Sequence, residues 1–295
     1  MALFFRASRF SFVVATALFL EGGGRGLRNR GEPAWFPANM RRLLLILFLA
    51  GGVSARAAVP PLLQAAVMKL AQDTDRWAYT QTAIEKDGKG KARSDVVVRF
   101  DPSKPYAEQY IPLKIDGKEP SESQIKKYRR QGEKRGERME KEEMTGVVAT
   151  SRRKSVGELM DLDKATVVEE NETIITYEVP LKKEGNDRLP PDKFLVTARV
   201  NKVGVALESV SAKLRSPLRE KIVIKVSAGE GHIEFKTVDP KHPPQLSEIR
   251  ANGSGSIFFV PIGRSYELRR EDYKRVKPFG DRFEVQIGAL KAIDF

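Results

Sequence analysis

The residue types that most often bind metals or carry catalysis are sparse in this chain of 295 residues. It has two histidines, His232 and His242, and no cysteine. A zinc site normally needs three or four converging ligands, so carboxylates would have to supply the remainder, and we expect no metal. Asp161 and Asp163 form a D-x-D pair, which we interpret as a polar loop rather than as a cation contact.

Motifs for nucleophilic catalysis and for nucleotide binding are absent. The chain has no G-x-S-x-G sequence, and no spacing rule assembles a Ser–His–Asp set from it. The glycine-rich run at 21–26 lacks G-x-G-x-x-G spacing, and Lys86 to Arg93 reads as a hairpin turn rather than a phosphate loop. We therefore expect that the protein binds no cofactor and is not an enzyme. Carboxylates that converge in a deep pocket would support catalysis instead.

A strongly basic segment, Lys126 to Arg138, is the clearest concentration of charge. It holds seven basic and two acidic residues, with Gly132 and Gly136 inside it. Three interpretations stay open: a solvated helix face, contact with anionic lipid or an envelope polymer, and nucleic acid, which export disfavours. The candidate contacts are Lys126, Lys127, Arg129, Arg130, Lys134, Arg135 and Arg138.

Aromatic and β-branched residues recur in the segments that we predict to be strands. They are core candidates first. If the sheet is curved and incompletely covered, some of them would line an apolar cavity. The cavity candidates are Trp77, Tyr79, Val96, Val98, Phe100, Phe194, Val196, Phe235 and Phe258.

Residues 40–57 have the three parts of a secretory signal: a basic start, a short apolar run at 43–50 and small residues at an A-x-A site. The run is shorter than the ~20 residues that span a bilayer. We predict cleavage before Ala58 and a soluble periplasmic product, without a cysteine for lipid attachment. Residues 1–39 are interpreted as a spurious extension, with a start at Met40; a long targeting segment and a membrane anchor are the alternatives.

The whole chain has 52 basic and 39 acidic residues, a net charge of +13. Residues 1–57 hold eight basic and two acidic residues. Residues 58–295 therefore hold 44 basic and 37 acidic residues, a net charge of +7. This excess is compatible with anionic partners but does not require them. A domain of this length buries about 70–75% of its unfolded surface, so a stable core needs neither disulfide nor metal.

The N-terminal part of the domain reads as a helix followed by three strands. Apolar residues from Leu63 to Ala71 recur at helical spacing behind Pro60 and Pro61. Strands follow at 77–84, 96–100 and 110–115, with an Asp-Gly turn after the first. Pro112 marks an edge strand or a bulge.

A charged helical insertion is predicted at 120–145. Ser121 and Gln124 have the spacing of a capping box. Because the helix lacks an apolar face, packing stabilises it little, and we expect its distal half to be exposed or frayed.

From Ala165 onward, strands alternate with short turns, the pattern of an antiparallel meander with one buried face. The apolar phase switches near Glu208, which predicts a bulge there. Turns are expected at 201–202, 228–231, 252–253 and 262–263. The predicted strands are 165–168, 173–179, 194–200, 203–214, 221–226, 232–238, 246–251, 256–262, 265–268 and 283–287.

The layout, together with VRFDPSKP at 98–105 and DGKEPS at 116–121, resembles the LolA/LolB-like superfamily of periplasmic lipoprotein carriers. The resemblance implies a half-open β-barrel whose concave face is lidded by helices and receives acyl chains. It covers roughly 62–287 in architecture, and no motif carries the family's functional residues over one by one. The charged helix is longer than a carrier lid needs.

These patterns together predict an α+β protein. One curved antiparallel sheet forms a half-open barrel over 58–295, covered by the N-terminal helix and the charged insertion. We expect a monomeric, exported, non-catalytic protein that binds a lipid, a lipoprotein or another apolar ligand. The alternative is a structural or interaction protein of the envelope, which docks through the basic segment on an anionic membrane surface or polymer.

Overall fold

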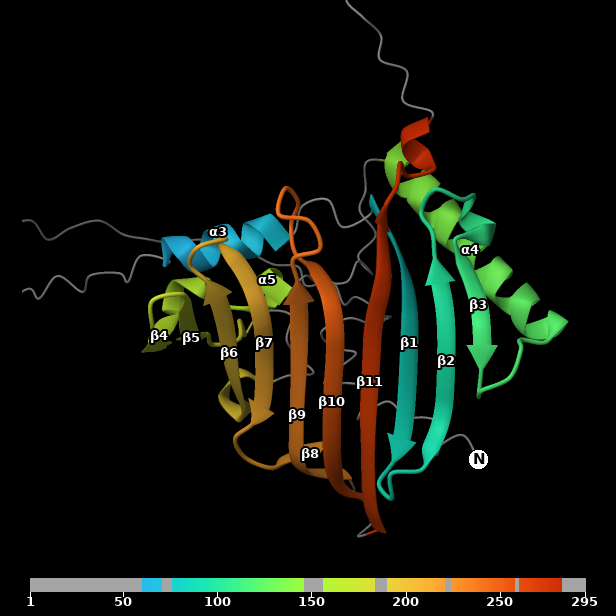
Figure 1. Ribbon diagram of the computed structural model, residues 1–295. Helices are drawn as coiled ribbons and strands as arrows, with labels where there is room; N and C mark the ends of the chain where they lie inside the picture. Colours follow the sequence, from blue (N-terminus) through green and yellow to red (C-terminus); the bar gives the residue numbers. More distant parts are fainter. Residues whose placement is uncertain are drawn as a thin grey trace, which may run out of the picture.

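The computed structural model describes residues 60–70, 76–145, 156–183, 190–220, 224–257 and 260–282 (Figure 1). The extension expected at 1–39, the signal peptide at 40–57, Phe258 and the strand expected at 283–287 lie outside these ranges.

The described residues form one antiparallel sheet of eleven strands with few helices. Ten strands follow in the order β3-β2-β1-β11-β10-β9-β7-β6-β5-β4, and β8 pairs with β9 alone. Among the described strands, β3 and β4 are the two ends of this order, so the sheet is open. The predicted fold class is confirmed. The strands are β1 Trp77–Asp87, β2 Ala92–Phe100, β3 Tyr110–Ile115, β4 Thr166–Glu170, β5 Ile174–Glu178, β6 Phe194–Asn201, β7 Ala206–Leu214, β8 Leu218–Glu220, β9 Ile224–Lys236, β10 Gln245–Ile257 and β11 Val260–Arg275.

Helices lie against two parts of the sheet. Helix α3 (Pro61–Leu70) lies mainly on β7 and touches β6 and the short α5 (Val156–Leu159), whereas α4 (Glu122–Thr145) runs beside β3 at the opposite edge (Figure 1). None of the described helices is long and apolar enough to cross a membrane. Single 3-10 turns complete the elements: η2 Tyr106–Glu108, η3 Leu162–Lys164, η4 Pro191–Lys193 and η5 Gly280–Arg282.

The sheet joins two parts of the chain that are far apart in sequence. Strands β1 to β3 form one set of hairpins, and β4 to β11 form a second meander. Strand β1 pairs with β11 over its length, from Trp77 opposite Arg275 to Asp87 opposite Arg264. The N-terminal hairpins are therefore attached to the rest of the sheet through the last strand, which local patterns do not predict.

Several local predictions are confirmed. The backbone N–H of Ser121 donates to Oε1 of Gln124 at 2.8 Å, and the Gln124 N–H donates back to Oγ of Ser121 at 3.4 Å, which is the capping box. The ladder between β6 and β7 shifts register opposite Glu208. Strand β3 is an edge strand, and its register with β2 shifts next to Pro112.

Three predicted turns are wrong. Strand β9 runs through 228–231, β10 runs through 252–253, and β11 runs through 262–263. Glycine in a strand interior can mark a bulge or a close approach of another backbone rather than a turn. At Gly255, a Cβ atom would lie 2.1 Å from the carbonyl oxygen of Lys225 on the paired strand. Gly255 therefore lies where the paired backbone leaves no room for a side chain.

Candidate ligand-binding face of the sheet

The pairing register separates the sheet into an apolar and a polar face, because directly opposed residues of antiparallel strands project to the same side. One row of paired residues is apolar without interruption across nine strands, from β5 to β3. We call it the apolar row. Its members are Tyr177, Ala198, Val210, Ile233, Ile249, Leu268, Ala83, Val96 and Ile115.

Burial changes along the apolar row. From Tyr177 to Leu268 its members are at most 7% exposed and belong to the main core cluster, with Leu63 and Ala66 of α3 at 0%. The last three members, Ala83, Val96 and Ile115 on β1, β2 and β3, are only half-buried. The same apolar face thus continues beyond the strands on which α3 lies.

The predicted cavity residues fall into two groups. Phe194 and Val196 are 5% and 4% exposed within the core cluster, and Phe235 packs partly buried against it. Their contacts are therefore with the protein's own core. The others lie on β1 and β2: Trp77, Tyr79, Val98 and Phe100 are buried and Val96 is half-buried.

An aromatic cluster borders the half-buried part of the apolar face. The Phe100 ring centroid lies 5.1 Å from that of Tyr79 and 4.8 Å from that of Tyr110. Tyr273 of β11 lies 5.9 Å from Tyr79 and 6.3 Å from Trp77. Burial raises the pKa of the Tyr273 hydroxyl, so it remains a neutral donor, and it bonds to the backbone carbonyl of Leu246.

Two arginines of β11 also project onto this face, since Arg264 and Arg270 have the same strand parity as Leu268. Nη1 of Arg264 lies 2.5 Å from Oε1 of Glu85. Nε of Arg270 donates to Oε1 of Gln81 at 3.1 Å, and its guanidinium carbon lies 4.2 Å from the Tyr79 ring centroid. A basic group therefore stands on each side of the half-buried stretch.

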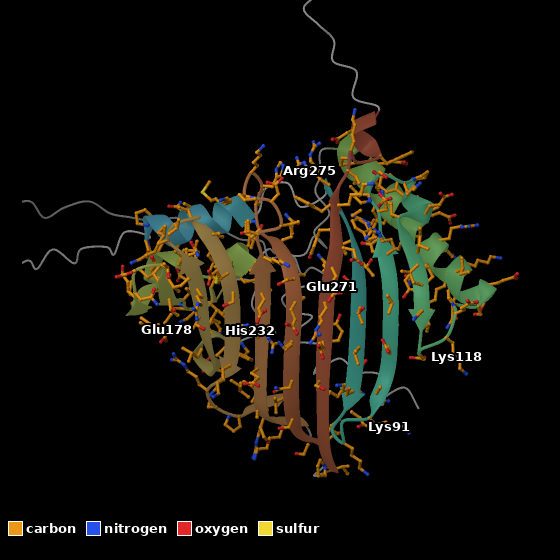
Figure 2. All side chains as sticks on the ribbon, viewed as in Figure 1. Lys91, Lys118, Glu178, His232, Glu271 and Arg275 are labelled. Atoms are coloured by element: carbon orange, nitrogen blue, oxygen red, sulfur yellow. The ribbon has the colours of Figure 1, made fainter. Side chains whose placement is uncertain are left out.

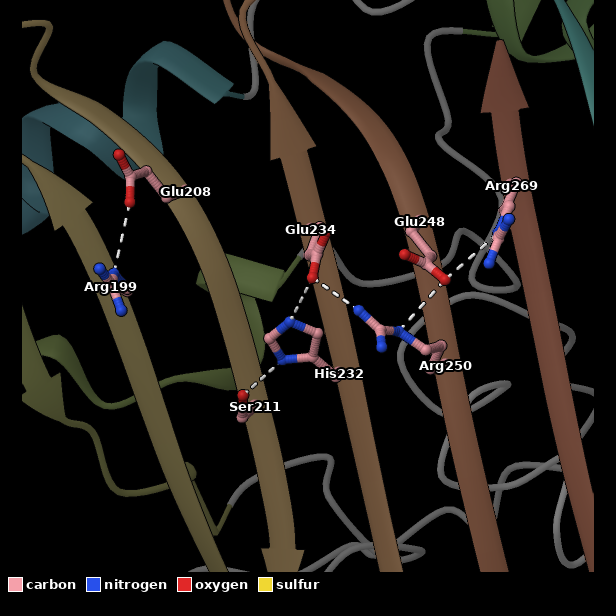
Figure 3. A network of polar contacts seen from close by, with 8 residues as sticks. All are labelled: Arg199, Glu208, Ser211, His232, Glu234, Glu248, Arg250 and Arg269. Carbon is pink, nitrogen blue, oxygen red and sulfur yellow. Dashed lines mark hydrogen bonds and ion pairs between the residues drawn. The ribbon is translucent and has the colours of Figure 1, made fainter.

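The polar face carries a chain of hydrogen bonds and ion pairs (Figure 3). Oγ of Ser211 lies 2.7 Å from Nδ1 of His232, whose Nε2 lies 3.0 Å from Oε1 of Glu234. Arg250 then bridges Glu234 at 2.8 Å and Glu248 at 3.1 Å. Polar residues on this face, such as Glu178, His232 and Glu271, lie on the different strands β5, β9 and β11 (Figure 2).

This Ser–His–Glu contact brings together residue types that occur in catalytic sites, and sequence spacing did not assemble it. Its setting does not suit acyl transfer. Ser211 is paired with Thr197 on one side and His232 on the other, in the middle of a ladder, so the adjacent amides serve strand pairing rather than an oxyanion. The partly exposed side chains fit a solvated polar network better.

The remaining metal candidates have other partners. His242 packs edge-on to Trp77 at 5.8 Å, and its Nδ1 lies 3.0 Å from Nη1 of Arg275. Asp161 pairs with Lys164 at 2.6 Å. Within the described ranges, no three His, Asp or Glu side chains gather as metal ligands.

The structure divides the predicted contacts on the basic helix. Arg135 points inward: Nη1 lies 3.3 Å from Oε1 of Gln109, and its guanidinium carbon lies 5.5 Å from the Phe100 ring centroid. The Arg135 side chain therefore makes its contacts within the protein and is a poor candidate for contact with a partner. The six others are exposed: Lys126, Lys127, Arg129, Arg130, Lys134 and Arg138.

No protein-family model and no curated protein matches this chain. Among solved structures, it is similar to a LolA superfamily protein from Nitrosomonas europaea, with 10% sequence identity and a TM-score of 0.32. The match covers 76% of this chain and 96% of that chain. A likeness at this identity and TM-score establishes neither family membership nor a shared function, so the resemblance noted from the sequence stays a prediction.

Proposed function

We propose that this chain is an exported envelope protein that binds an apolar or lipidic ligand without chemically changing it. The observation that supports this is the apolar row: it continues onto β1, β2 and β3, where its residues are only half-buried. Apolar surface that is not fully covered gains about 25 cal/mol per Å² when a ligand removes it from water. An acyl chain laid across these strands would gain this energy.

Binding without catalysis is favoured by the chemistry of the two faces. The half-buried stretch is bordered by aromatic rings and by arginines, which orient ligands but are poor nucleophiles or bases. The histidine with a serine partner lies on the opposite, polar face, away from this stretch. The signal peptide expected at 40–57 supports a periplasmic location in this proposal.

A matched pair of substitutions on β2 tests the binding face. Val96 and Val97 are neighbours of similar half-burial, but Val96 opposes Ala83 on the apolar face and Val97 opposes Thr82 on the polar face. We expect Val96→Asn to weaken displacement of a fluorescent fatty acid at least tenfold and Val97→Asn to change it less than twofold. Equal effects of the two substitutions, with both variants folded by thermal melting, would contradict the proposal.

A second function is favoured by one specific observation on α4. Lys126, Arg130 and Lys134 follow at four-residue intervals, are exposed, and have no carboxylate partner within the described part of the chain. Such a stripe fits an anionic membrane surface, at about 1 kcal/mol per basic residue near the surface. Co-sedimentation with vesicles containing anionic lipid, lost at high salt and in a variant with these three residues changed to Gln, would support it. Binding to neutral vesicles alone would contradict it.

A further inference from the structure

Arg264 and Arg270, which flank the half-buried stretch, differ in how their charge is balanced. Arg264 and Glu85 form a close pair, with side chains 19% and 23% exposed, so this position is neutral overall. Arg270 has an amide oxygen and an aromatic face as its contacts. In the ranges that the structure describes, no carboxylate pairs with it.

The surroundings of Arg270 favour an anion over water. Its guanidinium lies on the Tyr79 ring. Burial raises the pKa values of Tyr266 and Tyr273, and the nearby positive charge of Arg270 opposes this rise. A half-buried cation without a counter-ion keeps part of its desolvation cost. An anion that hydrogen-bonds to the planar guanidinium offsets this cost, and two parallel bonds fix its orientation.

The position of Arg270 relative to the apolar row defines what kind of anion fits. Arg270 opposes Gln81, and Gln81 opposes Val98. This line of residues lies next to the apolar row members Leu268, Ala83 and Val96, two positions away along each strand. An apolar chain on the row therefore ends beside the guanidinium.

From this arrangement, and resting on the function proposed above, we infer that the ligand is an acidic amphiphile whose anionic end binds Arg270. Its chain lies along the half-buried part of the apolar row. The carboxylate of a long-chain fatty acid is the simplest such group.

The test compares a long-chain fatty acid with its methyl ester on the purified full chain, below micelle-forming concentrations. One or two charge-assisted hydrogen bonds predict that the acid binds about tenfold to a hundredfold more tightly than the ester. Arg270→Gln should abolish this preference and leave ester binding within about twofold. The control is Arg269→Gln, since Arg269 lies on the polar face with Glu267 at 2.7 Å; this variant should keep the preference.

Each other outcome has a definite meaning. Equal binding of acid and ester by the unaltered chain would overturn the inference and leave apolar binding standing, whereas binding of neither would overturn both. Acetate or inorganic phosphate that competes as well as the fatty acid would show a bare anion site and contradict the amphiphile. If Arg270→Gln does not fold, Arg270→Lys keeps the charge without the planar fork and should retain a reduced preference; an unchanged or absent preference in that variant would count against Arg270.

Discussion

Tyr273 shows how one side chain links the aromatic cluster to the strand ladder. Its ring packs near Trp77 and Tyr79, and its hydroxyl donates to the carbonyl oxygen of Leu246 on β10. Burial raises the pKa of this hydroxyl above that of a free tyrosine. The folded protein therefore holds Tyr273 neutral at a pH at which the unfolded chain would ionise it.

The raised pKa of Tyr273 predicts how the stability of the protein depends on pH. Because the folded pKa lies above the unfolded value near 10, the contribution of Tyr273 is complete below pH 10 and is lost as the pH rises through the folded pKa. We expect the free energy of unfolding to fall above pH 10 less steeply in Tyr273→Phe than in the unaltered protein. At pH 7 the variant should lose about 0.5–1.5 kcal/mol, the net value of one hydrogen bond.

Urea unfolding measured from pH 7 to pH 11 checks both statements. Tyr266, whose pKa burial also raises, titrates in both proteins and supplies the common background. Parallel pH profiles of the two proteins would show that Tyr273 is not held neutral by the fold.

The charged helix α4 packs against the rest of the protein although it has no apolar stripe. Its two glycines are buried where the helix crosses η2: a Cβ on Gly132 would lie 2.0 Å from the carbonyl oxygen of Tyr106, and one on Gly136 would lie 2.5 Å from the Tyr106 ring. Close backbone approach and the inward Arg135 hold the helix in place. Residues 137–141 are exposed as expected, and the helix continues to Thr145.

The close contact at Gly132 predicts that Gly→Ala there lowers the stability of the protein, the opposite of its usual effect in a helix. In an exposed helix, Gly→Ala stabilises by about 1 kcal/mol. At Gly132 the added methyl meets backbone, so we expect Gly132→Ala to lower stability by about 1–3 kcal/mol, the usual cost of overpacking. Glu133→Ala, at the neighbouring exposed position, is the control and should change stability by less than about 0.5 kcal/mol. Thermal melting distinguishes the two, and a Gly132→Ala variant that melts higher would contradict the docked helix.

The elements that could be predicted from the sequence are those whose signals are local. The capping box at Ser121, the helical spacing from Leu63 and the apolar phase switch at Glu208 each involve residues a few positions apart. The turns predicted at 228–231, 252–253 and 262–263 were wrong because these residues lie in strands, and their pairing depends on a partner strand elsewhere in the chain. The sequence alone does not distinguish a glycine in a turn from a glycine inside a paired strand.

The candidate site was predicted in part for the same reason. Trp77, Tyr79, Val98 and Phe100 lie in segments that the sequence predicts to be strands, so they were named as cavity candidates. Arg270 was missed because the run from Arg269 to Asp272 looks like the polar end of a strand. In the structure this run continues β11, and strand parity sends Arg269 and Arg270 to opposite faces. The alternation of Tyr266, Leu268 and Arg270 in the sequence was the signal that could have placed Arg270 on the apolar face.

At the level of the whole molecule, the sheet depends on the pairing of β1 with β11. A chain that ends at Ile257 keeps β1, β2 and β3 but lacks their neighbour. Without β11, strand β1 loses one of its two ladders and the aromatic cluster loses Tyr273, so we expect the amide protons of β1 to exchange much faster in the truncated chain than in the full chain. Hydrogen exchange with mass spectrometry measures this, and the full chain is the reference. Protection of β1 in the truncated chain would show that the first three strands fold independently.

In the export proposed above, the position of β11 near the end of the described chain has a consequence for folding. A chain that crosses a membrane N-terminus first delivers β1, β2 and β3 long before the strand that must lie beside them. Until then β1 presents an open edge with free amides and carbonyls, the feature that promotes association between chains. Such a protein has a long interval of vulnerability during secretion, and a holding chaperone on the receiving side would shorten it.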